Sequence, residues 1–453
     1  MLTLPPVTSA SGDSALLSAL LSGENFWPTD PRSMQDLGLP EPFVESQLLR
    51  LLLAGGNMTG RQLAGEICIS FRIVETILER LRGRRLLVHC GSASMNDYVY
   101  GLSDEGRKRA QVFHSECSYL GPAPVPLMDY VISVEAQAIG EHPIRRSELL
   151  DSFYNVSISD DLLDMLGPAV NSASGLFLYG ATGNGKSTLA RCITSCFGQE
   201  IWIPYAVVEG REIITLFDLA YHEQVDLPSE SHSFDRRWVR VRRPTVVVGG
   251  ELTMDGLELR HDAVSNVCEA PLQMKSNGGC LLIDDFGRQR ISPADLLNRW
   301  IIPLENRHDY LTLPSGKKIQ VPFQQLIIFS TNLDPSDLVD EAFLRRIPYR
   351  IEVKDPNENE FHRLFQIAAE KLGCSYEQES VEYLLQNLYR RHGRALRRCH
   401  ARDLLLQIRN HCVYHDLPFE MLPEHFDAVA GCFFTQIRTR GLSPAGARES
   451  HEH

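Results

Sequence analysis

Long apolar runs are missing from this 453-residue sequence. A membrane-spanning helix needs about 20 consecutive apolar residues, and no uninterrupted stretch here comes near that length. The N-terminus also lacks the positively charged start and apolar core of a secretory signal. These absences argue against a membrane protein and against secretion, and they predict a cytoplasmic protein.

Paired cysteines and excess positive charge are missing as well. The 11 cysteines are scattered and include no C-x-x-C pair, which argues against a zinc site or a redox dithiol. Reduced thiols are expected instead. The formal net charge is −13, so any contact with nucleic acid must be local rather than a property of the whole chain. No internal repeat is evident.

A glycine-rich stretch is the most informative feature that is present. Four apolar residues at 176–179 run into G-x-x-x-x-G-K-S at Gly180–Ser187, and a helical pattern follows. Strand, glycine loop and helix in this order predict a Walker A site for ATP and Mg²⁺. The glycines let backbone N–H groups converge on the phosphates, Lys186 reaches the β- and γ-phosphates, and Ser187 ligates Mg²⁺. The predicted nucleotide-binding residues are Gly180, Ala181, Thr182, Gly183, Asn184, Gly185, Lys186, Ser187 and Thr188.

The run Gly279–Asp285 supplies the second half of such a site. Its apolar residues predict a buried strand that ends in two adjacent carboxylates, Asp284 and Asp285. Two acids at the end of a buried strand are costly without a metal ion or hydrogen-bond donors. We therefore expect Asp284 to bind Mg²⁺ together with Ser187, and Asp285 to orient the attacking water.

Three further candidate residues follow the next buried strand, which is predicted at 326–329. Asn332 ends the sequence Ser-Thr-Asn, where its amide is expected to hold the lytic water or to touch the γ-phosphate. Arg345 and Arg346 then lie at the end of a short helix, before a strand predicted at 349–353. With Asp285, these residues are the predicted catalytic set.

The order of these motifs resembles that of the AAA+ ATPases, over residues 160–435. The resemblance implies a parallel sheet core, a C-terminal α-helical lid, and a ring, usually a hexamer, with ATP between neighbours. It implies an arginine finger at Arg346 or Arg345, and Arg346 is preferred because it directly precedes an apolar residue. It also implies a sensor-two arginine in the lid, for which Arg397 is the candidate and Arg394 and Arg402 are alternatives. The whole chain resembles a poorly characterised bacterial AAA+ group with a winged-helix-like N-terminus.

Two details of the family resemblance point in different directions. The family's Walker B strand usually ends in Asp-Glu, whereas Ile283–Gly287 carries Asp-Asp and looks like bacterial replication initiators and helicase loaders. That likeness favours a DNA-linked role. A hairpin predicted at 310–321 looks instead like the MoxR and magnesium-chelatase side of the family, which is associated with remodelling of protein or metal complexes.

Residues 41–115 predict three helices followed by a two-stranded ribbon, which resembles a winged helix-turn-helix domain. Such domains often bind DNA. The third helix exposes Glu75 and Glu79, however, and DNA phosphates would repel both. The ribbon turn carries no Lys or Arg, and the arginines at 80–85 also suit the negative end of the helix dipole. DNA binding and protein docking are both open for this module.

The stretch 236–243 places five arginines around Trp238. Interleaved arginines and an aromatic ring in a strand suit a phosphate backbone with one base stacked on the ring. The alternative is an edge strand protected by its charge, or a subunit contact.

The sequence thus predicts an α/β protein with six parts. They are a flexible segment at 1–40, a winged-helix-like domain at 41–115, a linker with helices at 116–157, the nucleotide-binding domain at 158–355, a helical lid at 356–435 and a flexible tail at 436–453. The predicted function is a ring-forming ATPase that remodels an unidentified protein complex. The alternatives are a DNA-associated ATPase of helicase-loader, transposition or defence type, and a nucleotide-controlled switch with weak hydrolysis.

Overall fold

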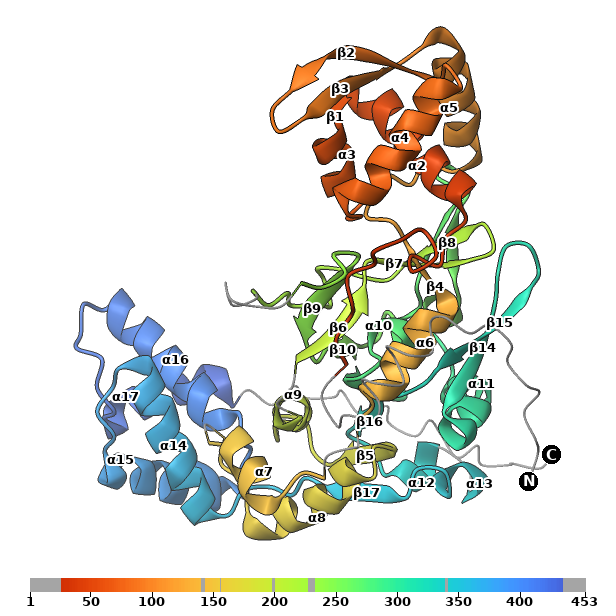
Figure 1. Ribbon diagram of the computed structural model, residues 1–453. Helices are drawn as coiled ribbons and strands as arrows, with labels where there is room; N and C mark the ends of the chain where they lie inside the picture. The colour runs from red at the N-terminus through yellow and green to blue at the C-terminus, as the bar shows by residue number, and fades with distance from the viewer. Residues whose placement is uncertain are drawn as a thin grey trace, which may run out of the picture. The chain divides into compact units, whose positions relative to one another are not determined.

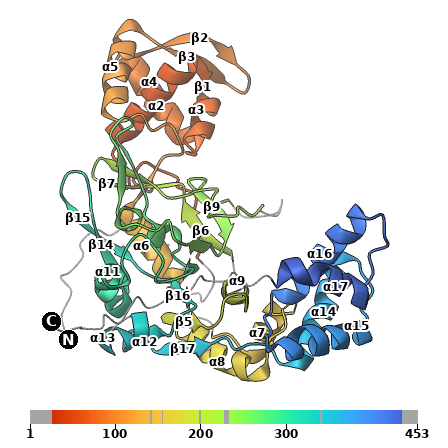
Figure 2. The same cartoon turned by 180° about the vertical axis from the view of Figure 1, so that it is seen from behind.

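A computed structural model describes residues 26–139, 143–154, 156–197, 200–226, 233–338 and 341–434. These residues form two units, drawn in Figure 1 and seen from behind in Figure 2. The larger unit holds the described residues up to Ala181 and those from Lys186 to Val353. The smaller unit holds Thr182–Gly185 and the described residues from Lys354 onward. None of the helices in the described ranges has the length and apolar character needed to cross a membrane.

A five-stranded parallel sheet lies in the larger unit, in the order β10-β13-β16-β5-β17. Its strands are β5 (Gly175–Tyr179), β10 (Thr245–Val248), β13 (Cys280–Ile283), β16 (Leu326–Thr331) and β17 (Tyr349–Glu352). The strand that ends before Asn332 therefore lies between the strand that precedes the glycine loop and the strand that precedes Asp284. The prediction of an α/β fold with a parallel sheet core is confirmed.

Helices cover both faces of this sheet, as its apolar strands require. Along β5, Leu176 and Leu178 share one apolar cluster with residues of α8 and α9, whereas Phe177 shares another with Trp300 of α11. Successive residues of a strand point to opposite faces, so α8 and α9 cover one face and α11 covers the other. The helices of this part are α7 (Arg146–Ser152), α8 (Asp160–Asn171), α9 (Lys186–Cys196), α10 (Leu272–Lys275), α11 (Pro293–Asn306), α12 (Pro335–Leu338) and α13 (Glu341–Leu344), with a 3₁₀ turn at Met254–Leu257.

Four strands between Lys186 and Asp284 form a second sheet together with β4, in the order β11-β12-β8-β7-β4. Its strands are β4 (Val125–Pro126), β7 (Ala206–Glu209), β8 (Glu212–Thr215), β11 (Arg260–Asp262) and β12 (Val267–Glu269). Two separate ribbons pair β6 (Glu200–Pro204) with β9 (Trp238–Arg242), and β14 (His308–Thr312) with β15 (Lys318–Pro322). The hairpin expected at 310–321 is confirmed as β14–β15. β7 and β8 also pair in an antiparallel hairpin.

The N-terminal module contains the three expected helices and the ribbon. Its elements are α2 (Glu41–Gly55), β1 (Met58–Thr59), α3 (Gly60–Glu66), α4 (Phe71–Gly83), β2 (Leu87–Ala93), β3 (Asp97–Leu102) and α5 (Asp104–Glu116), and helix α6 (Leu127–Ala136) follows the connector. The ribbon gains a third strand, because β1 pairs with β3. The module's core includes Ala206, Val208 and Ile213 of the second sheet, so its apolar core continues into that sheet.

The expectation of a flexible segment is wrong for residues 26–40. Leu37 and Leu39 are buried in the core of the N-terminal module, and Phe26 packs against Trp238 with ring centroids 5.4 Å apart. Few apolar residues are present in this stretch, but each has a buried partner far away in the sequence. Residues 1–25 lie outside the described residues, as does the predicted tail at 436–453.

The smaller unit is helical after Pro356, as expected. It contains α14 (Glu358–Leu372), α15 (Gln378–Tyr383), a π-helical turn at Leu384–Tyr389, a 3₁₀ turn at Arg390–His392, α16 (His400–Tyr414) and α17 (Pro423–Phe433). The segment from Arg394 to Cys399 is not helical, and α16 begins only at His400. Gly393 adopts a left-handed conformation with φ +60°. The Cys399 N–H then donates to the carbonyl of Gly183, 2.9 Å away, instead of joining a helix ladder.

Candidate nucleotide-binding site

Glycine conformation shapes the loop between β5 and α9. Gly180, Gly183 and Gly185 have φ values of +133°, +88° and +80°, which L side chains rarely adopt. Space also excludes a side chain at Gly180, since a Cβ there would lie 2.6 Å from the carbonyl oxygen of Val353. The loop can therefore bring its backbone N–H groups close to an anion.

The predicted loop residues are divided between the two units. Gly180, Ala181, Lys186, Ser187 and Thr188 belong to the larger unit, and Thr182–Gly185 belong to the smaller one. Thr182 and Thr188 are exposed, while Asn184 and Lys186 are buried. The loop thus presents two hydroxyl side chains to solvent and fixes an amide and an ammonium inside the protein.

Lys186 lies over the loop as a phosphate-binding lysine must. Its Nζ donates to the carbonyl oxygens of Gly180 and Ala181, at 2.9 Å and 3.2 Å. The side chain is only 8% exposed. The chain therefore holds a cation at the first turn of α9, where the positive end of the helix dipole adds to its attraction for an anion.

Ser187 and Asp284 meet although 97 residues separate them. The Ser187 hydroxyl donates to Asp284 Oδ2 at 2.6 Å, and the amide nitrogen of Gln289 donates to the Asp284 carbonyl at 2.8 Å. A hydroxyl and a carboxylate in contact are the hard oxygen donors that Mg²⁺ takes when substrate phosphates and water complete its shell. The described residues contain no cluster of three or more His, Cys, Asp or Glu side chains that could hold a metal alone. Ser187 and Asp284 therefore fit a nucleotide-bound Mg²⁺.

Asp285 occupies a strained turn at the end of β13. Its φ is +50°, and its backbone N–H donates to Asp284 Oδ1 at 3.1 Å. Asp tolerates left-handed conformations better than most residues, but the conformation still costs free energy. The next residue, Phe286, donates its N–H to the Ser330 carbonyl of β16 at 2.7 Å. The turn is thereby fixed to the neighbouring strand, and the Asp285 carboxylate is exposed to solvent.

Asn332 lies just beyond the carboxyl end of β16, and its side chain is half-buried. Because β16 separates β5 from β13, this end of the strand lies between the phosphate loop and the Asp284 turn. Ligands of parallel α/β sheets bind at the carboxyl ends of the strands. The fold therefore brings Asn332 to the same edge as Lys186 and Asp284.

Arg345 and Arg346 follow α13 and border a hollow of about 400 Å³ with Leu304 and Glu305. Arg345 is exposed. Arg346 Nε donates to Glu305 Oε1 of α11 at 2.7 Å. Nothing in the local sequence pointed to Glu305, because the pair spans 41 residues and depends on how α11 packs.

Arg397 lies in the non-helical segment before α16. It forms an ion pair with Asp355, which also accepts a hydrogen bond from the side chain of Asn184 at 2.7 Å. The two alternatives have other contacts: Arg394 stacks 4.1 Å from the ring centre of Phe434, and Arg402 pairs with its neighbour Asp403. Within the smaller unit, Arg397 is thus linked through Asp355 to Asn184 of the loop.

The arginine stretch at 236–243 does not offer a stacking surface, and that interpretation is wrong. Trp238 is 5% exposed because its ring is packed in the core against Phe26. Arg237 forms a buried ion pair with Asp235 at 2.7 Å. The other paired arginines are Arg240 with Glu200 at 2.7 Å and Arg242 with Glu223 at 3.4 Å. Arg243 donates to the carbonyls of Gln137 and Gly278, and burial lowers its pKa to about 10.

Two of the basic side chains at the end of α4 also form ion pairs within the module. Arg84 pairs with Glu45 of α2 at 2.7 Å, and Arg80 pairs with Glu41 of the same helix. These pairs join α4 to α2, but the arginine side chains remain 56% and 49% exposed, and pairs of this kind contribute only about 0–1 kcal/mol to stability.

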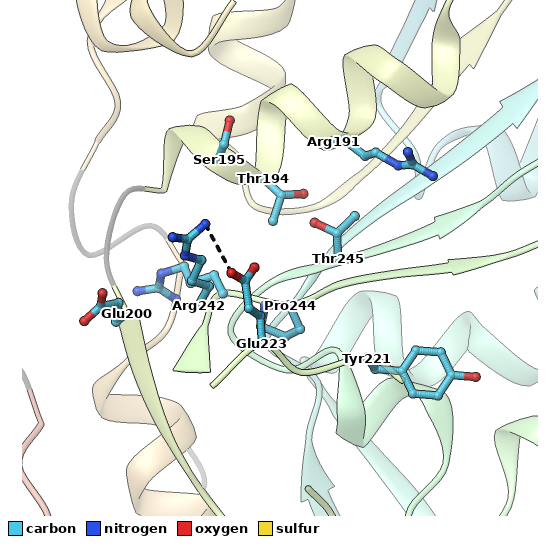
Figure 3. A pocket seen from close by; sticks show the side chains of 10 residues that line it. Arg191, Thr194, Ser195, Glu200, Tyr221, Glu223, Arg242, Pro244 and Thr245 are labelled. Atoms are coloured by element: carbon cyan, nitrogen blue, oxygen red, sulfur yellow. Dashed lines mark ion pairs between the residues drawn. The ribbon is translucent and has the colours of Figure 1, made fainter. Parts of the chain in front are cut away.

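A separate pocket of about 460 Å³ lies beside the C-terminal half of α9 (Figure 3). Its lining residues are Arg191, Thr194, Ser195, Glu200, Tyr221, Glu223, Arg242, Arg243, Pro244 and Thr245. None of the predicted site residues is among them. Figure 3 shows Arg242 and Glu223 turned toward each other across it, so its charges are partly paired.

Comparisons with known proteins place few limits on function. A family model described as a domain of unknown function (DUF8689) matches residues 357–431, which is less than half of the chain. No curated protein matches the sequence. Among solved structures, the RuvB Holliday junction branch migration motor of Thermotoga maritima is 15% identical, with 61% of this chain and 69% of that chain covered and a TM-score of 0.36. NtrX from Brucella abortus is 14% identical, with 65% and 60% covered and a TM-score of 0.40, and its complex with ATP is also 14% identical, with 60% and 56% covered and a TM-score of 0.34. TM-scores this low do not establish a common fold.

Proposed function

We propose that this chain is an AAA+ ATPase that binds ATP with Mg²⁺ and hydrolyses it. One observation carries the proposal: the Ser187 hydroxyl contacts the Asp284 carboxylate at 2.6 Å beside a lysine held over a glycine loop. A phosphate loop alone would bind an anion. A loop joined to a carboxylate from another strand of the same sheet supplies the oxygens that a nucleotide-bound metal needs.

Each residue of the site has a distinct role in this proposal. The loop N–H groups and Lys186 bind the phosphates, and Ser187 and Asp284 hold the ion. When bound, Mg²⁺ would neutralise phosphate charge. Asp285, exposed at its fixed turn, orients the attacking water, and Asn332 holds that water or contacts the γ-phosphate. The C-terminal helices act as a lid, with Arg397 as the sensor-two residue.

We further propose that the chain works as a homo-oligomeric ring, with Arg346 of one subunit completing the site of the next. Support comes from the position of Arg346 beside an open hollow of about 400 Å³, away from the loop in the sequence. A finger of this kind stabilises the charge that develops in phosphoryl transfer. Hydrolysis would then move the lid against the sheet.

We propose that the substrate remodelled by this ATPase is a protein complex, and that the winged-helix-like module at 41–115 binds it. The burial of Trp238 supports protein docking over DNA binding, because it removes the aromatic surface on which a base could stack. The continuous core between the module and the second sheet offers a route by which motion could reach a docked partner.

Asp285→Asn should bind ATP normally and hydrolyse it about 10²- to 10⁴-fold more slowly, because an amide cannot take a proton from water. Isothermal titration with Mg-ATP and phosphate release at saturating ATP measure the two steps separately. Asp255→Asn, which changes an exposed aspartate in the 3₁₀ turn, is the matched control and should behave as wild type. Near-normal turnover of Asp285→Asn would show that another residue orients the water.

The protein should show no salt-dependent binding to double-stranded DNA, even at ~50 mM salt, where phosphate contacts are strongest. Fluorescence anisotropy with a labelled duplex, with and without ATP, checks this. If DNA does bind, neutralising Arg236 and Arg242, which are exposed, tests the arginine stretch. Binding that these changes abolish would favour the DNA-associated alternative over protein docking.

A further inference from the structure

Asp355 is the third residue after β17 and the second residue of the C-terminal part of the smaller unit, which begins at Lys354. Its Oδ1 accepts a hydrogen bond from Asn184 Nδ2 at 2.7 Å and forms an ion pair with Arg397. One carboxylate oxygen therefore joins a residue of the phosphate loop to the candidate sensor arginine. The sequence marked Asp355 only as a domain boundary.

The segment at 397–399 lies directly against the loop. The Arg398 N–H donates to Asn184 Oδ1 at 3.4 Å, and the Cys399 N–H donates to the Gly183 carbonyl at 2.9 Å. A side chain on Gly183 would come within 2.7 Å of the Cys399 sulfur. Asn184 is 1% exposed, so its amide is fixed between these groups. The backbone that carries Arg397 is therefore anchored to the loop independently of the ion pair.

The ion pair itself is more accessible than the anchor. The side chain of Arg397 is 26% exposed and that of Asp355 is 41% exposed. A guanidinium binds a carboxylate and a phosphate through the same donor geometry. Ion pairs with this exposure contribute only about 0–1 kcal/mol to stability. A phosphate can therefore replace the carboxylate as the partner of Arg397.

We propose that Asp355 is a positioning residue that stands in for a nucleotide phosphate. It holds Arg397 beside the loop when no nucleotide is bound, and it gives up the arginine to a phosphate of bound ATP. This inference rests on the proposed function of the loop and of Arg397. Asp355 thus competes with the phosphates of ATP for Arg397. Removing the charge of Asp355 should therefore strengthen nucleotide binding.

The test is a double-mutant cycle on Mg-ATP affinity of the full-length protein, measured by isothermal titration. Asp355→Asn keeps an oxygen that accepts the hydrogen bond from Asn184 but removes the competing charge. It should lower the Kd roughly two- to fivefold, the range expected for an exposed arginine–carboxylate pair. In an Arg397→Ala background the same substitution should change the Kd by less than about 1.5-fold, because the competition is gone.

Glu358→Gln is the matched control, since it removes another exposed arginine–carboxylate pair, that with Arg390 at 2.6 Å, from the same unit. It should leave the Kd unchanged. If Asp355→Asn fails to fold by thermal unfolding, Asp355→Ser carries the same prediction, because its hydroxyl also accepts a hydrogen bond. The inference would be overturned if Asp355→Asn raised the Kd for Mg-ATP or left it unchanged. It would also be overturned if Asp355→Asn lowered the Kd equally in the presence and absence of Arg397. A folded wild type that binds no Mg-ATP would instead contradict the proposed function itself.

Discussion

Lys186→Ala should abolish ATP binding and leave the protein folded. The ammonium is held over the loop by the carbonyls of Gly180 and Ala181, where we expect it to meet the β- and γ-phosphates. Without the buried ammonium, the phosphates would lose their main cationic side-chain partner. Charge-assisted hydrogen bonds of this kind are stronger than hydrogen bonds between neutral groups. We expect the Kd for Mg-ATP to rise by at least about a hundredfold, which corresponds to two contacts worth about 1.5 kcal/mol each.

Titration calorimetry with Mg-ATP measures this effect, and circular dichroism and thermal unfolding show whether the variant is folded. Lys317→Ala is the control. It removes an exposed lysine of the β14–β15 ribbon, which pairs with Glu209 at 2.5 Å, and should leave affinity unchanged. Affinity retained by a folded Lys186→Ala protein would mean that the glycine loop does not bind the nucleotide phosphates.

Arg346→Ala should retain ATP binding and lose turnover. Arginine fingers of GTPases contribute ~10³–10⁵ in rate, and the loss here should approach that range because the residue acts on the transition state rather than on the bound substrate. Phosphate release at saturating ATP measures it. Arg390→Ala is the control, since it also loses an exposed arginine–glutamate pair, and it should keep wild-type turnover.

A mixing experiment separates a finger that acts on a neighbour from a structural role of the Arg346–Glu305 pair. Arg346→Ala subunits keep a binding site but lack the finger, whereas Lys186→Ala subunits keep the finger but lack the site. Each protein alone should be inactive, and the mixture should regain a measurable part of wild-type turnover. A mixture as inactive as its components would contradict action between subunits, and loss of turnover on Arg345→Ala instead would assign the role to that residue.

The parts of the site that could be predicted are those encoded in short stretches of sequence. The glycine loop, Lys186 and the Asp284–Asp285 pair each have the residue types that their chemistry requires, next to an apolar strand that positions them. The β14–β15 hairpin was predictable for the same reason, because a turn signal lies between two apolar segments.

The parts that could not be predicted depend on contacts between distant segments. The pairing of Asp355 with Arg397, and of Glu305 with Arg346, required the fold, since side chains 41 or 42 residues apart carry no shared pattern. The same reason explains why the interpretation of residues 236–243 was wrong. Trp238 and its arginines had the composition of a nucleic-acid contact, but Phe26 packs against Trp238 and Glu200 pairs with Arg240, and both partners are distant in the sequence.

Phosphate release from ATP by the purified chain tests the central claim most directly, with Lys186→Ala and Asp285→Asn measured beside it. We expect repeated, Mg²⁺-dependent turnover by the wild type, no turnover by Lys186→Ala, and slow turnover by an Asp285→Asn protein that still binds ATP. The claim would be contradicted if the folded wild type released phosphate no faster than Lys186→Ala. The comparison is made with Mg²⁺ present and across a range of protein concentrations.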